Sequence, residues 1–181
     1  MSNPNVIIIH GNGETTIDNC WYRSVARQLG ALGLDVIART MPMAETAPAH
    51  IWLPHIEEEL GADENSILVG HSSGAIAAMR YTETHRIYGS VLVGAYHTDL
   101  GNFYEKRSGY FGKPWDWDAI KANQHWIAQF ASTDDPFIPI EESRHVCDRL
   151  DTDYFEFTDR GHFQGYDFPE LTAVIKEKLE L

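Results

Sequence analysis

The chain has 181 residues and a mass of 20.5 kDa, which suits one domain with one sizeable core. Its 27 acidic and 14 basic residues give a formal net charge of −13, which disfavours nucleic acids and anionic membranes as partners. The hydrophobic fraction of 43% is too high for a disordered chain, and the longest purely apolar run, 75–79, is far short of the ~20 residues of a membrane span.

The N-terminal residues and the cysteines of the chain indicate its cellular compartment. The first five residues carry no basic side chain and lead directly into a strand-like run, so they do not look like a signal peptide. Cys20 and Cys147 belong to no CxxC motif and have no histidine at zinc-finger spacing. We therefore expect a cytoplasmic or nuclear protein with reduced cysteines, no bound metal and no cofactor.

Short runs rich in Val and Ile alternate with stretches of helical periodicity. Runs of this length are typical of strands that are buried on both faces of a parallel sheet. The alternation predicts an α/β fold in a single domain, 1–181, with helices on both faces of a mostly parallel sheet. The expected strands are 6–9, 34–38, 66–69, 90–93, 126–131 and 154–157, and the expected helices are 21–32, 51–60, 73–85, 140–150 and 169–179.

Residues 97–123 interrupt this alternation. The segment is long for a connection, and its glycines and Pro114 break any periodicity. Its aromatic content argues against disorder. Two interpretations stay open: an excursion packed over a sheet edge, or a small lid over a site.

The segment 70–74 reads Gly-His-Ser-Ser-Gly and matches the pattern G-x-S-x-G. An expected strand leads into it and an expected helix leaves it, which is the context of a serine nucleophile at a tight turn. At the start of that helix, free N–H groups favour developing negative charge. Ser72 is therefore the candidate nucleophile, with a glycine-rich turn of purely structural role as the alternative.

A serine nucleophile needs a base and a group that orients the base. In folds of this type the acid and then the histidine follow the serine along the chain, each after a strand. His162 is the candidate base, and His71 is assigned a supporting role. Of the adjacent Asp134 and Asp135, we favour Asp135 as the acid because it begins an Asp-x-x-x-Pro segment, while Asp134 caps or braces the turn.

The tetrahedral intermediate needs hydrogen-bond donors aimed at its oxyanion. The backbone N–H of Ser73, directly after the nucleophile, is one candidate. The other comes from the glycine-rich loop after the first expected strand, with the backbone of Asn12 preferred and that of Gly11 next. This loop lacks the patterns of phosphate-binding and dinucleotide-binding turns.

Several sequence blocks together resemble the retinoblastoma-binding protein 9 family of small serine hydrolases. The resemblance runs over nearly the whole chain and implies the same triad of Ser72, Asp135 and His162. It also implies a compact α/β-hydrolase sheet of about six strands without a large cap domain. The matching blocks are 10–13, 70–81, 108–111, 121–123, 132–137 and 161–164.

The resemblance also bears on partners and substrates. The family name refers to a partner bound through Leu-x-Cys-x-Glu, but here residues 60–64 carry Ala62 in place of the cysteine, so binding of the retinoblastoma protein is doubtful. The family implies hydrolysis of amino-acid esters or aminoacyl amides. The alternative function is that of a protein-binding adaptor on a hydrolase scaffold.

The aromatic residues of 97–123 suggest a substrate pocket. That segment follows an expected strand next to the nucleophile strand, and such connections face the active-site crevice of parallel sheets. The net charge of −13 should attract cationic substrates, and an aromatic wall can hold an ammonium group by cation–π contact. Together these favour small hydrophobic amino-acid esters or amides as substrates. The predicted wall consists of Tyr110, Phe111, Trp115 and Trp117, and packing in the core is a comparable explanation for any one of them.

Overall fold

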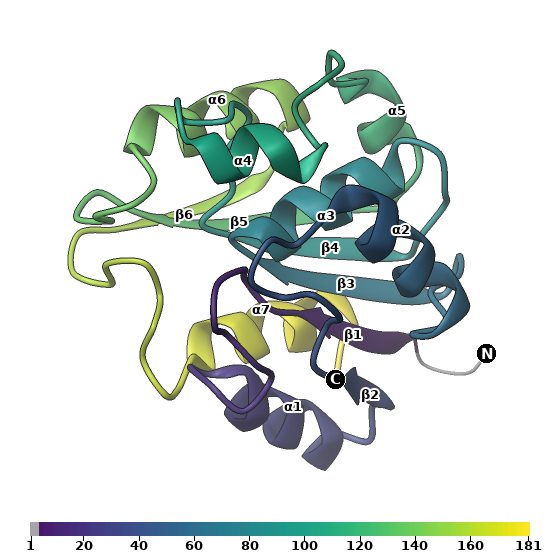
Figure 1. Cartoon of the computed structure of the whole chain (residues 1–181). Helices are drawn as coiled ribbons and strands as arrows, with labels where there is room; N and C mark the ends of the chain where they lie inside the picture. Colours follow the sequence, from purple (N-terminus) through teal and green to yellow (C-terminus); the bar gives the residue numbers. More distant parts are fainter. Residues whose placement is uncertain (1–3) are drawn as a thin grey trace.

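The computed structural model describes residues 4–181 and contains one sheet of six strands, all parallel (Figure 1). The strand order is β2-β1-β3-β4-β5-β6. Every strand expected from the sequence is present, which confirms the predicted fold class. The strands are β1 (Asn5–Ile9), β2 (Val36–Ala38), β3 (Ser66–His71), β4 (Gly89–Val93), β5 (Ile127–Ser132) and β6 (Asp153–Phe157).

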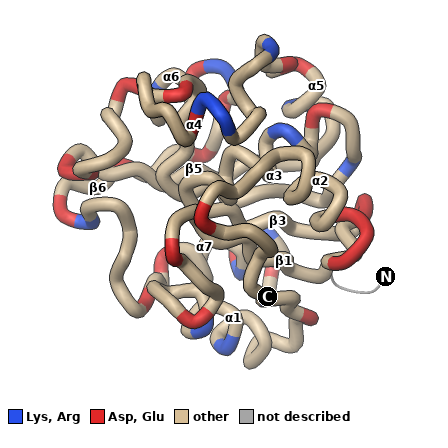
Figure 2. Tube along the Cα trace, in the orientation of Figure 1, with Lys and Arg blue, Asp and Glu red and all other residues tan. Residues whose placement is uncertain are grey.

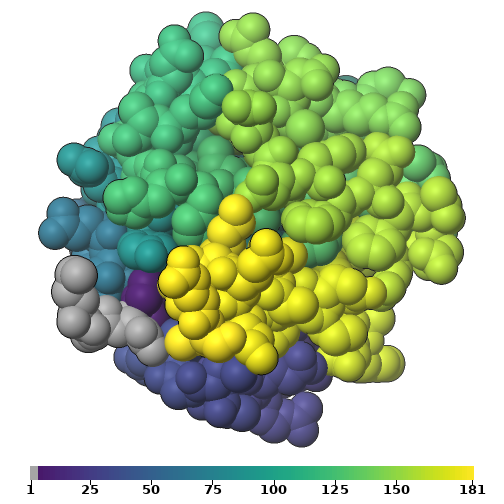
Figure 3. Space-filling view, turned by 180° about the vertical axis from the view of Figure 1, so that it is seen from behind, coloured from purple at the N-terminus to yellow at the C-terminus, as the bar shows by residue number. Residues whose placement is uncertain are grey.

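Helices cover both faces of the sheet and bury two apolar cores. Alternate residues of β1 point to opposite faces, so Ile7 packs into one core and Ile8 into the other. Helices α1 (Tyr22–Ala31) and α7 (Pro169–Lys178) cover one face and lie side by side in the view from behind (Figure 3). The other face carries α2 (Ala49–Glu58), α3 (Ser73–Thr82), α5 (Trp117–Ala122) and α6 (Ile140–Leu150).

The strand order places a crevice beside the loop that carries Ser72. From β1 the chain first moves outward to β2, and it then crosses back so that β3 lies on the other side of β1. Connections at the carboxyl ends of two such strands diverge and leave a crevice, where ligands bind in open α/β sheets. Ile9 pairs with Gly70, so the loops after β1 and β3 begin at the same level.

Residues 97–123 form two short helices that the sequence periodicity did not predict, α4 (Phe103–Ser108) and α5. Both helices begin with a side-chain cap, because Asn102 accepts hydrogen bonds from two backbone N–H groups of α4 and Asp116 accepts one from α5. The buried guanidinium of Arg80, on α3, donates to the backbone oxygens of Tyr110 and Lys113 at 2.8 and 2.7 Å. These bonds attach the segment to the core.

The chain has 27 acidic and 14 basic residues, and Figure 2 shows their positions along the Cα trace. Within residues 4–181, no helix is both long and apolar enough to cross a membrane.

Candidate active site

Ser72 occupies the tight turn between β3 and α3 in a backbone conformation that non-glycine residues rarely adopt, with φ 55° and ψ −120°. The turn is possible because its glycines have no side chains. A Cβ on Gly74 would lie 2.1 Å from the carbonyl oxygen of Ile9, and one on Gly70 would lie 2.4 Å from that of Gly74. Ser72 is 8% exposed and lines a cavity, so its strained turn presents the hydroxyl to a space that a substrate can enter.

His162 and Asp135, which are 27 positions apart in the chain, form a hydrogen-bonded pair. His162 Nδ1–H donates to Asp135 Oδ2 at 2.7 Å. The other oxygen of Asp135 accepts the backbone N–H groups of Phe137 and Ile138 at 2.8 and 3.0 Å, which fixes the orientation of the carboxylate. His162 is 9% exposed and lines the same cavity as Ser72, and its Nε2 makes no hydrogen bond within residues 4–181.

Asp134 has a different environment from its neighbour. Its Oδ1 accepts hydrogen bonds from Ser132 Oγ at 2.5 Å and from the backbone N–H of Gly161 at 2.8 Å. It therefore connects the end of β5 to the loop that carries His162, and it makes no hydrogen bond to the imidazole. Asp135 thus contacts the imidazole of His162, whereas Asp134 contacts Ser132 and the backbone of Gly161.

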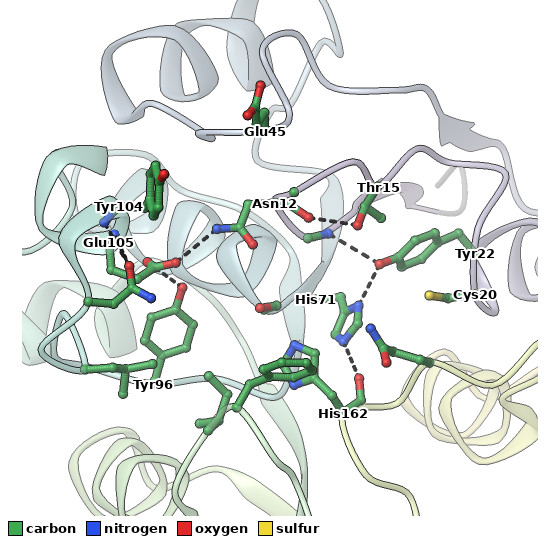
Figure 4. Close-up of a pocket in the computed structure, with 18 residues that line it drawn as sticks. Asn12, Thr15, Cys20, Tyr22, Glu45, His71, Tyr96, Tyr104, Glu105 and His162 are labelled. Atoms are coloured by element: carbon green, nitrogen blue, oxygen red, sulfur yellow. Dashed lines mark hydrogen bonds between the residues drawn. The ribbon is translucent and has the colours of Figure 1, made fainter.

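His71 supports the loop of His162 through a chain of hydrogen bonds (Figure 4). Its Nε2–H donates to the backbone oxygen of His162 at 2.9 Å, and its Nδ1 accepts from the hydroxyl of Tyr22 at 2.6 Å. Burial lowers the pKa of His71 to about 3, so the ring is neutral at neutral pH, as this pattern of one donor and one acceptor requires. Tyr22 was not singled out in the sequence.

Two backbone N–H groups of the loop after β1, those of Gly11 and Asn12, are candidate donors to an oxyanion. The N–H of Gly11 donates to Tyr22 Oη at 3.3 Å, so this second-choice oxyanion donor is already engaged. The next peptide is oriented by His10, whose Nδ1–H donates to the oxygen of Gly11 at 2.7 Å. Because C=O and N–H of a peptide point in opposite directions, the N–H of Asn12 faces away from His10.

The backbone N–H groups of Asn12 and of Ser73, the first residue of α3, donate to no group within residues 4–181. Both N–H groups are therefore free to donate to another group.

The cavity at this site has a volume of about 490 Å³. Residues from both sides of the crevice and from the start of the 97–123 segment form its walls. The lining includes Gly11, Asn12, Cys20, Tyr22, Glu45, His71, Ser72, Tyr96, Leu100, Asn102, Tyr104, Glu105, Phe137, Ile138 and His162.

The predicted aromatic wall is wrong, because none of its four residues lines this cavity. Tyr110 is a fully buried core residue, and Phe111, Trp115 and Trp117 pack against the same core. The ring of Trp115 lies 3.6 Å from the guanidinium carbon of Arg80, so its cation–π partner belongs to the protein. The part of the segment that does reach the cavity is 100–105, and Tyr96 lies just before it.

Within residues 4–181, no group of three or more His, Cys, Asp or Glu side chains is arranged to hold a metal ion. The sulfur atoms of Cys20 and Cys147 are free.

Comparison with known proteins identifies the family. A family model described as serine hydrolase matches residues 6–171. The chain belongs to the serine hydrolase family. This serine hydrolase is 50% identical to rat "Serine hydrolase RBBP9" over 99% of its own length and 98% of the rat protein. The resemblance drawn from the sequence blocks is thereby confirmed, and the protein is an enzyme of the hydrolase class.

Solved structures show the same fold. The ydeN gene product of B. subtilis superposes with a TM-score of 0.90 at 23% identity, with 99% of this serine hydrolase and 100% of that chain covered. Est1E from Butyrivibrio proteoclasticus gives a TM-score of 0.77 at 16% identity, with 99% and 88% covered. At these identities the likeness supports the α/β-hydrolase fold.

Proposed function

We propose that this hydrolase cleaves small esters or amides through an acyl-enzyme on Ser72. His162 Nε2 removes the hydroxyl proton as Ser72 Oγ bonds to the substrate carbonyl carbon, and the carbonyl electrons move onto oxygen. The oxyanion then re-forms the carbonyl and expels the alcohol or amine, which takes the proton from His162. Asp135 accepts Nδ1–H throughout and stabilises the imidazolium.

Deacylation repeats these steps with water. His162 takes a proton from the water as its oxygen attacks the acyl carbon, and the proton passes to Ser72 Oγ as the acid leaves. In both halves of the cycle the backbone N–H groups of Ser73 and Asn12 are the proposed donors to the oxyanion, an interaction whose removal costs about 3 to 4 kcal/mol in related sites. Gly11 is omitted because its N–H binds Tyr22.

The observation that carries this proposal is the hydrogen bond of 2.7 Å between His162 and Asp135 at the wall of the cavity that Ser72 also lines. A base held by a buried carboxylate beside a strained serine turn is the arrangement that nucleophilic catalysis requires. The cavity volume of about 490 Å³ suits a substrate of the size of an amino-acid ester or amide.

Labelling with a fluorophosphonate probe tests the proposal. The probe phosphonylates an activated serine, so mass spectrometry of the digested protein should place the adduct on Ser72. Heat-unfolded protein is the control and should not react. An adduct on Ser73 or Ser132, or no adduct on the folded enzyme, would contradict the proposed mechanism.

We also propose that residues 60–64 do not bind the retinoblastoma pocket protein. Besides the missing cysteine, Leu60 is 2% and Ala62 8% exposed, and both side chains belong to the core. An extended peptide at this place would have to leave the fold. Calorimetric titration with the purified pocket domain should show no binding at micromolar concentrations, and a sub-micromolar affinity that is lost on changing Glu64 would overturn the claim.

A further inference from the structure

A buried carboxylate with no basic partner lines the catalytic cavity. Glu105, on α4, is 9% exposed and contributes to the cavity wall. No ion pair of residues 4–181 includes it. A buried charge normally has a partner of opposite charge, because desolvation is otherwise uncompensated. Glu105 therefore needs an explanation that the hydrolysis mechanism does not supply.

The carboxylate is held in position by neutral donors. Its Oε1 accepts from Asn12 Nδ2 at 3.0 Å, and its Oε2 accepts from the hydroxyl of Tyr96 at 2.8 Å (Figure 4). Each carboxylate oxygen can accept two hydrogen bonds, so each keeps one lone pair for another donor. Burial raises the pKa of Glu105, which is the effect of a charge without sufficient compensation.

The environment of Glu105 favours a cation rather than a neutral or acidic group. Of the residues that line the cavity within the described chain, none is Lys or Arg, and the second carboxylate is the exposed Glu45. The rings of Tyr96 and Tyr104 contribute to the same wall, and aromatic faces attract ammonium groups. Tyr96 Oη also lies 3.3 Å from Ser73 Oγ, so two hydrogen bonds connect Glu105 to the residue after the nucleophile.

We propose that Glu105 is a specificity-determining residue that accepts a hydrogen bond from a primary ammonium group on the substrate. This inference rests on the proposed acyl-enzyme mechanism at Ser72 and names the side chain that selects the substrate. The ammonium supplies the positive charge that the protein does not place beside Glu105. It also offsets the negative charge of Glu105 when an oxyanion forms in the same cavity.

Paired substrates and paired variants test the assignment. The substrates are phenylalanine methyl ester and methyl 3-phenylpropanoate, which differ only in the amino group. Glu105→Gln should lower kcat/KM for the amino ester by about tenfold to a hundredfold, mainly through KM, because a charge-assisted hydrogen bond is lost. The neutral ester should change by less than about threefold. Glu45→Gln is the matched control, since it removes the same charge from an exposed residue that lines the same cavity. Its effect on kcat/KM should be small and should disappear at high salt.

Two further measurements make the result decisive. Phenethylammonium, which has no carbonyl, should inhibit hydrolysis of the neutral ester competitively, and about tenfold more weakly in Glu105→Gln. Fluorophosphonate labelling of Ser72 in both variants should equal the wild-type value, which shows that the site is folded.

Equal losses on both esters would overturn the assignment and make Glu105 a positioning residue for Asn12 and Tyr96. No loss on the amino ester would overturn it as well. In either case the wild-type enzyme would still be labelled on Ser72 and would still hydrolyse the neutral ester, whereas failure of the acyl-enzyme mechanism would remove the labelling.

Discussion

Replacing Ser72 by alanine is expected to lower kcat by about 10⁶-fold, the effect of removing the nucleophile in other serine hydrolases with a triad. The substitution deletes Oγ, the atom that must bond to the acyl carbon. Alanine meets the same backbone strain at φ 55°, so the thermal midpoint should change by less than about 2 °C. Steady-state hydrolysis of a neutral ester and thermal unfolding followed by circular dichroism measure the two quantities.

Ser73→Ala is the matched control for this experiment. Ser73 lies next to the nucleophile, but its proposed contribution is the backbone N–H, which alanine retains. The side chain loses a contact of 3.3 Å with Tyr96 Oη, so a reduction of less than about tenfold in kcat is expected. If Ser72→Ala kept more than a hundredth of the wild-type rate while Ser73→Ala was inactive, the nucleophile would have been assigned to the wrong serine.

The strands and helices of the sheet could be predicted from the sequence because the residues of each element form a clear hydrophobic pattern. Val6 to Ile9 have apolar side chains on both faces, and β1 is buried on both faces in the structure. The turn at Ser72 is encoded locally in part, since a Cβ on Gly70 would collide with the backbone of Gly74 and Ala75 in the same turn. Such features depend on neighbours in the chain, and a single sequence contains that information.

The 97–123 segment could not be predicted in the same way. Trp115 and Tyr104 are both aromatic residues of one loop, yet Trp115 packs on buried Arg80, while Tyr104 lies 64% exposed beside the cavity. Arg80 attracts the first ring through a contact between residues far apart in the chain. Composition gave no means of separating an aromatic core residue from an aromatic pocket residue.

The supporting residues of the site were missed for the same reason. Tyr22 joins Gly11 to His71, and Glu105 reaches Asn12 across 93 positions of sequence. Neither residue belongs to a motif, and a tyrosine on a helix or a glutamate after a capping asparagine has ordinary local explanations. Tyr22 and Glu105 come near the site only in the folded chain. The strand order β2-β1-β3-β4 brings the segments that follow these strands to one edge of the sheet.

The choice between adjacent aspartates leads to the second large expected effect. Asp135→Asn should lower kcat by about 10⁴-fold, because an amide at this position stabilises the wrong tautomer of His162 and no longer balances the charge of the imidazolium. Asp134→Asn should reduce kcat by less than about tenfold, since an amide oxygen can still accept from Ser132 Oγ and Gly161 N–H. The two variants make the same chemical change at adjacent residues. Hydrolysis rates of a neutral ester therefore separate the orientation of His162 from the support of its loop. Thermal midpoints check that both variants are folded. Were Asp134→Asn the more damaging change, the hydrogen bond of 2.7 Å between His162 and Asp135 would not be the one that orients the base.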